Sequence, residues 1–184
     1  MRTTWTMLAA ALVAVLAGGC GDDTEPSEPD VAAWSVPQAG FCDDVVAGSG
    51  LDGEVEETLS GDDEDTTATC ALTTGDSRVD LVVRVAEQAG DQYDQTLGEL
   101  EDGFTGFEDA EVSQPEGWWT RGTRFEAVEA ESVRLTDLLA DDTLVVRLQL
   151  VGTPAPGDPT ERQADAVETA DALESAIEDV LDPS

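Results

Sequence analysis

Apolar residues recur at helical spacing in four parts of the chain. The clearest stripe lies in residues 91–104, where Tyr93, Leu97, Leu100 and Phe104 share one helical face. The last predicted helix also has a recognisable N-terminus, because Asp158 and Pro159 are residue types typical of helix starts. In residues 51–59, three aliphatic residues four apart predict a weak helical continuation of the first helix. The three predicted helices therefore span residues 40–47, 91–104 and 159–181.

Alternating apolar and polar residues predict extended strands between these helices. In residues 78–86, four aliphatic residues alternate with charged or polar ones, the pattern of a strand with one buried face. Gly75 and Asp76 precede it and predict a turn, so this strand and the one before it form a hairpin. Val112 fits a short strand inside a loop. The main predicted strands span residues 66–73, 78–86, 118–128, 132–139 and 143–151.

Short turns between consecutive strands predict an antiparallel sheet. About five strands are expected, packed by an N-terminal, a middle and a C-terminal helix, which is an α+β fold. Residues 39–182 would form this single domain.

The N-terminus predicts export and lipid attachment. Residues 1–19 combine one arginine, an apolar run and two small residues before Cys20, as in a lipoprotein signal peptide. The apolar run is shorter than the roughly 20 residues that cross a membrane. We expect acylated Cys20 to anchor the mature chain to the cell membrane on the extracytoplasmic side. Residues 20–38 are acidic and contain prolines, which predicts a tether. Secretion with a free Cys20 is the alternative.

Charge and composition exclude several functions. The chain has 42 acidic residues, 8 basic residues that are all arginine, no histidine and a net charge of −34. The negative electrostatic field of so acidic a chain repels nucleic acids. Without histidine or lysine, the chain lacks Ser-His-Asp catalysis, imidazole metal sites and Schiff-base chemistry. No cofactor is expected. The acidity fits solubility in a lysine-poor proteome, adaptation to salt, or attraction of a basic partner.

Two cysteines remain when Cys20 is assigned to lipid. Cys42 and Cys70 are expected to form a disulfide, because paired cysteines in exported chains usually join. The bridge would fix the first helix to the first strand.

These features together resemble a known group of proteins. Leu16–Cys20, a helix beginning near Cys42, a strand carrying Cys70 and a closing amphipathic helix look like small cysteine-pair lipoproteins of actinobacteria. Some of these are similar in fold to extracellular sensor domains and to the PsbP-like α+β sandwich. The resemblance covers residues 39–182 and rests on order and spacing. Leu72 departs from the aromatic residue that often follows the second cysteine. The resemblance implies a binding or sensing role without enzymatic activity.

Candidate contact residues cluster near the start of the third predicted strand. Trp118 and Trp119 are adjacent, so in a strand one should enter the core and the other should face solvent beside Arg121 or Arg124. An exposed indole beside an arginine could contact a sugar or anchor a partner. Alternatively, a helix or the tether covers it. The acidic run 62–65 lacks the spacing of a calcium loop, and no metal site is predicted.

Three functions follow in order of preference. The first is a non-catalytic, membrane-anchored domain that binds an unknown protein or a cell-envelope component. The second is a carrier or sensor of a small ligand, with a pocket between sheet and helix. The third is a hydrolase that uses carboxylates.

Overall fold

The computed structural model describes residues 34–62, 65–74, 77–107, 110–128, 132–152 and 158–181. The fold is α+β, as predicted. Its elements are α1 (Phe41–Ser49), β1 (Glu54–Gly61), β2 (Thr66–Thr74), β3 (Ser77–Val85), α2 (Ala89–Phe104), β4 (Glu111–Ser113), β5 (Arg121–Val128), β6 (Val133–Asp141), β7 (Leu144–Gly152) and α3 (Pro159–Leu181).

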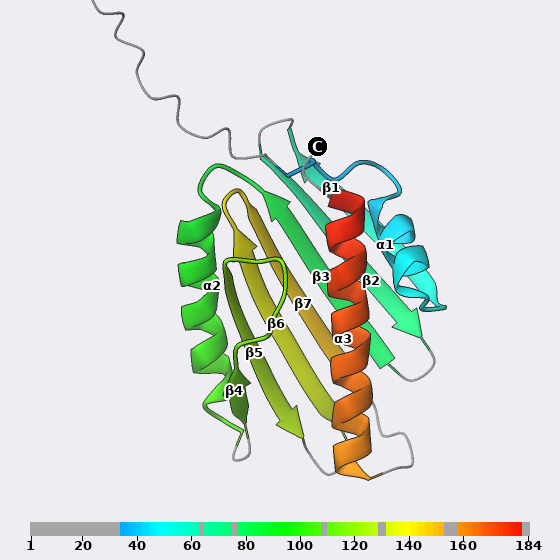
Figure 1. Cartoon of the computed structure of the whole chain (residues 1–184), viewed down its shortest axis with the longest axis vertical. Coiled ribbons are helices and arrows are strands. Elements are labelled where there is room, and N and C mark those ends of the chain that lie inside the picture. The colour runs from blue at the N-terminus through cyan, green and yellow to red at the C-terminus, as the bar shows by residue number, and fades with distance from the viewer. Residues whose placement is uncertain are drawn as a thin grey trace, which may run out of the picture. The chain divides into compact units, whose positions relative to one another are not determined.

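All strands join one antiparallel sheet in the order β1-β2-β3-β7-β6-β5-β4 (Figure 1). The sheet has seven strands rather than the expected five. One additional strand is β1, in the segment expected to be helical. That prediction is wrong because residues four apart share a face in a strand as well as in a helix. The other is β4, the short strand expected around Val112.

The two faces of the sheet carry different helices. Helices α1 and α3 pack together against one face, over the alternating aliphatic residues of β2, β3 and β7 (Figure 1). Helix α2 packs against β6 and β7 from the opposite face, where Tyr93 meets Leu138 and Val145. Strand β6 is therefore buried on both sides along most of its length.

Among the described residues, no helix packs over β1, β2 and β3 on the face that carries α2. On these strands, alternation turns a polar set of residues away from α1 and α3. Glu56, Thr69 and Arg78 on this side are exposed. One half of the sheet is thus covered on both faces, and the other half on one face only.

Trp34 joins the domain core before the first helix. Its side chain is 7% exposed, its Nε1 donates to Oδ2 of Asp141 at 3.1 Å, and its ring centroid lies 4.8 Å from that of Trp118. The backbone of Ser35 also donates to the carbonyl of Leu181 at 3.2 Å. The end of the predicted tether is therefore docked on the domain beside the end of α3.

Two features predicted for the N-terminus, the signal peptide and Cys20, lie outside the described residues. Within the part of the chain that is described, no helix is both long and apolar enough to cross a membrane.

Candidate functional site

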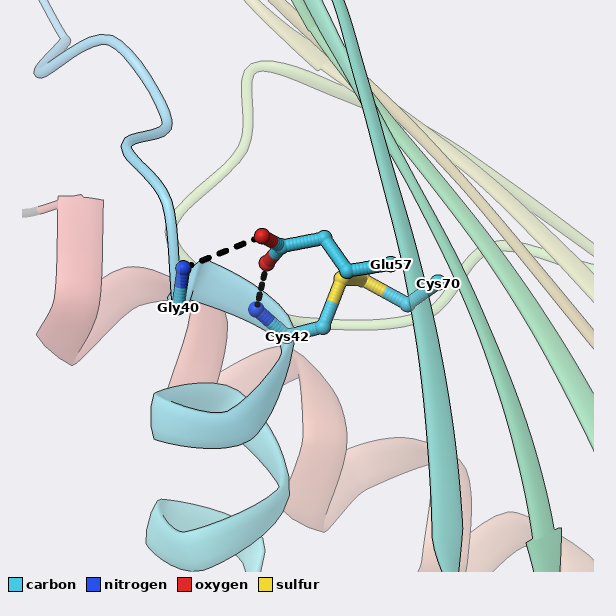
Figure 2. Close-up of a disulfide and its surroundings, with 4 residues drawn as sticks. All are labelled: Gly40, Cys42, Glu57 and Cys70. Atoms are coloured by element: carbon cyan, nitrogen blue, oxygen red, sulfur yellow. Dashed lines mark hydrogen bonds between the residues drawn. A yellow bond between two sulfur atoms is a disulfide. The ribbon is translucent and has the colours of Figure 1, made fainter.

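The Cys42–Cys70 disulfide is present, as predicted (Figure 2). It joins α1 to β2, with 5.6 Å between the two Cα atoms. Glu57 of β1 lies beside it and accepts hydrogen bonds from the backbone N–H groups of Gly40 at 3.0 Å and Cys42 at 2.9 Å (Figure 2). The first N–H groups of a helix have no partner within the helix, so Glu57 supplies a charged cap from a neighbouring strand.

Trp118 and Trp119 do not divide into one buried and one exposed indole. Both are half-buried, because both precede β5 and strand alternation does not govern them. The Trp118 Nε1 donates to the backbone carbonyl of Glu174 at 3.2 Å, and the Trp119 Nε1 donates to that of Pro115 at 3.0 Å. A Cβ atom at Gly122 would collide with the Trp119 ring, so this glycine admits the indole.

The two candidate arginines face opposite sides of the sheet. Arg121 and Arg124 are three residues apart on one strand, so alternation separates them. Arg121 forms an ion pair with Asp94 of α2, and its guanidinium carbon lies 4.1 Å from the centroid of the Tyr93 ring. The structure therefore places Trp118 and Arg124 on the α3 side and Arg121 on the α2 side. Contact of these residues with a partner stays a prediction.

Arg124 is the centre of a buried carboxylate cluster, which we define as Arg124, Asp137, Asp171 and Glu174. Its Nε donates to Oδ1 of Asp137 at 2.7 Å and its Nη2 to Oδ2 at 2.9 Å. The Nη2 also lies 2.8 Å from Oδ1 of Asp171 and 3.4 Å from Oε1 of Glu174. Asp171 is exposed, and the other three side chains are buried. Three carboxyl groups therefore surround one guanidinium.

This cluster holds a proton that ordinary carboxyl groups would lose. Burial raises the pKa of Asp137, and burial together with Asp137 raises the pKa of Glu174 to about 9. The paired hydrogen bonds from Arg124 favour the charged form of Asp137, so Glu174 carries the proton at neutral pH. Burial alone would lower the pKa of Arg124, but its bonds to Asp137 raise that pKa overall. The cluster is internally paired and ties β5 and β6 to α3.

A groove runs between α2 and the open half of the sheet, and we call it the α2 groove. It consists of two cavities that share Arg84 and Gln92. The donor cavity has a volume of about 220 Å³ and is lined by Thr67, Val82, Arg84, Gln92, Thr96, Leu138, Val145 and Arg147. The acidic cavity has a volume of about 390 Å³ and is lined by Asp65, Arg84, Ala86, Glu87, Gln88, Asp91, Gln92 and Gln95.

The two cavities differ in chemistry. The polar side chains of the donor cavity are hydroxyl, amide or guanidinium groups, and each can donate a hydrogen bond. The acidic cavity has three carboxylates, one of which, Asp65, is paired with Arg84 through an Nε–Oδ1 distance of 2.8 Å. That pairing lowers the pKa of Asp65. The groove therefore has one donor-rich end and one anionic end.

No known family model matches this chain. A search of curated proteins likewise gives no match, so membership of the lipoprotein group named above stays a prediction. Within the described residues, no group of three or more cysteine, aspartate or glutamate side chains could hold a metal ion.

Sequence reasoning did not find the α2 groove. Alternation alone places Arg84 and Arg147 on the polar faces of their strands. Nothing in the pattern shows that β3 and β7 are neighbours, because Arg84 and its register partner Val145 are 61 positions apart in the sequence (145 − 84). The missing information was strand order, which decides which arginines share a cavity.

Proposed function

We propose that this chain is a membrane-anchored, extracytoplasmic lipoprotein domain that binds a small ligand without catalysis. The α2 groove is the observation that carries the binding role, because it is a polar hollow between helix and sheet beside a half-covered face. The sequence supports the location through its leader and Cys20, and the Cys42–Cys70 disulfide fits an oxidising compartment. The lack of histidine and lysine in the sequence supports a non-catalytic role.

The anchor is tested by replacing Cys20 with alanine in the full-length chain. We expect the wild-type protein to fractionate with membranes into detergent and the Cys20→Ala protein to lose this partition. Equal partition of both proteins would overturn the lipid anchor.

The binding role is tested by native mass spectrometry of protein extracted from its own membranes. We expect a bound small molecule on the wild-type protein. Gln92→Trp should remove it, because Gln92 lines both cavities. Glu101→Trp changes an exposed position on the same helix and should retain the ligand. Absence of added mass on the wild-type protein, or its persistence in Gln92→Trp, would contradict the proposal.

A protein partner is the second candidate, favoured by strand β1. This strand forms one edge of the sheet, and its exposed side chains include Glu54 and Glu56. An open edge can accept an added strand through backbone hydrogen bonds. The negative charge of β1 favours a basic extended segment as the added strand. Photo-crosslinking from Thr58 in native membranes would capture such a partner, whereas crosslinking from Glu178 of α3 should not.

A further inference from the structure

The arginines of this chain are concentrated on one face of the sheet. Six of them lie on strands, and alternation turns five toward the side that carries α2. Only Arg124 faces α3. Two of these five arginines, Arg84 and Arg147, line the α2 groove.

Arg147 differs from the other arginines in its surroundings. Arg78, Arg84, Arg121 and Arg124 form ion pairs, and Arg134 lies over the ring of Phe107. Arg162 is likewise not without a polar or ring partner. Among the arginines that the structure describes, Arg147 alone has no ion pair, hydrogen bond or ring contact. Acidic residues outnumber basic ones 42 to 8, so an arginine without a carboxylate partner is unexpected.

The position of Arg147 makes this lack of a partner significant. It is half-buried in the donor cavity, opposite Val82 of β3 and Leu138 of β6. A guanidinium stays charged at all ordinary pH values, so its partial burial is unfavourable unless an acceptor reaches it. Arg84 lies diagonally across from Arg147, since its register partner is Val145. Gln92 and Thr96 on α2 supply further donors from the opposite wall.

We propose that the donor cavity binds the carboxylate or phosphate group of a small molecule, with Arg147 as its principal contact. This inference rests on the proposed binding role of the α2 groove. A guanidinium can hold either oxyanion with two parallel hydrogen bonds. The aliphatic side chains of Val82, Leu138 and Val145 line the cavity and can contact an apolar part of the ligand.

The adjoining acidic cavity narrows the ligand class. Glu87 and Asp91 line the groove beyond Arg84, where a second negative charge on the ligand would be repelled. The ligand therefore has one anionic end, and the remainder is neutral or cationic. The donor cavity, at about 220 Å³, is smaller than typical drug-sized pockets of roughly 300–1,000 Å³, which also favours a small molecule.

The test is an NMR titration of the mature full-length protein in detergent micelles. Sodium acetate and sodium phosphate are the probes, each exchanged against sodium chloride at constant ionic strength. The readout is the side-chain amide signal of Gln92, which lines the cavity and is present in the wild type and in each Arg147 variant. We expect a saturable shift with at least one probe. Arg147→Gln should weaken binding about tenfold or more, because it removes a charge-assisted hydrogen bond to the anion. Arg147→Lys keeps the charge but loses the two-pronged geometry, so its affinity should be intermediate.

Arg78→Gln is the matched control, because Arg78 is an exposed arginine on the same face, paired with Asp80. It should bind both probes as the wild type does. Saturation by acetate alone indicates a carboxylate ligand, and saturation by phosphate alone indicates a phosphate ligand. Non-saturable shifts with both probes, or equal affinity in Arg147→Gln, would overturn the inference. If Arg147→Gln instead retains the native ligand that Gln92→Trp loses, the binding role stands and the anion assignment fails.

Discussion

Replacing Glu174 with glutamine should change how the stability of the domain depends on pH. Glu174 is 3% exposed and lies on α3 beside Asp137 and Arg124. Burial and the neighbouring Asp137 raise its pKa from the ordinary value of 4.5 to about 9. The native protein therefore keeps a proton that the unfolded chain releases over much of the accessible pH range.

The magnitude follows from this difference in bound protons. Below the unfolded pKa both states are protonated and Glu174 has no pH-dependent effect. As pH rises toward the folded pKa, each unit favours the unfolded state by about 1.4 kcal/mol. Between about pH 5.5 and about pH 7.5, the wild type should lose about 2.7 kcal/mol of stability through this one group. Glu174→Gln has no such proton, and its carbonyl and amide can replace the protonated carboxyl group.

The assay is urea unfolding at several pH values in that window, followed by tryptophan fluorescence. The measured quantity is the free energy of unfolding of Glu174→Gln minus that of the wild type. We expect this difference to rise with pH by about 2.7 kcal/mol across the window, whatever its starting value. Acidic residues away from this cluster ionise alike in both proteins, so their effects cancel, and the paired hydrogen bonds from Arg124 favour the charged form of Asp137 in both. Glu178→Gln, at an exposed position on the same helix, should follow the wild type at every pH.

A difference that stays constant to within about 0.5 kcal/mol across the window would refute the reasoning. It would mean that native Glu174 is ionised in this range and that Arg124 compensates both buried carboxylates. A difference that falls with pH would reverse the sign and exclude a raised pKa for Glu174.

Three further predictions concern the first helix and the docked N-terminal segment. Cys42→Ala combined with Cys70→Ala opens a loop closed across 28 residues, and urea unfolding should show a loss of about 3–4 kcal/mol. Glu57→Gln weakens the charged cap of α1 and should lower the free energy of unfolding by about 1 kcal/mol. Glu56→Gln, on the other face of β1, should have little effect. A larger loss in Glu56→Gln than in Glu57→Gln would contradict the capping role. Trp34→Ala should lower the free energy of unfolding by about 3 kcal/mol and reduce the near-ultraviolet circular dichroism signal, and Trp34→Phe should be intermediate. An unchanged melting temperature of Trp34→Ala would show that the segment around Trp34 is not docked in solution.

Local patterns predicted most of the individual elements. The hairpin of β2 and β3, helix α2 and the start of α3 follow from alternation, helical spacing and helix-start residues. Asp158 does accept a hydrogen bond from the N–H of Thr160 at 2.8 Å, as its position suggested. The β1 segment was the main error, because Val55 and Leu59 fit both periods and no glycine or proline lies between them to decide.

Sites formed by distant residues were much harder to predict. The disulfide could be predicted because assigning Cys20 to lipid leaves a single pair of cysteines. The carboxylate cluster requires Arg124, Asp137 and Glu174 to meet across two strands and a helix, which single-strand alternation cannot show. The abundance of acidic residues made each carboxylate uninformative by itself. Arginine is rare in this chain, so its placement was the more useful signal.

An anion site in a protein of charge −34 requires that local contacts outweigh the overall field. At physiological ionic strength, charges separated by more than about 8 Å are largely screened. A ligand in the donor cavity would therefore respond mainly to Arg147, Arg84 and the surrounding hydroxyl and amide groups. Within that distance of the surface, the acidic side chains slow the approach of highly charged anions and of nucleic acid. Overall charge and local chemistry thus act together, so that the groove would select small ligands with a single anionic group.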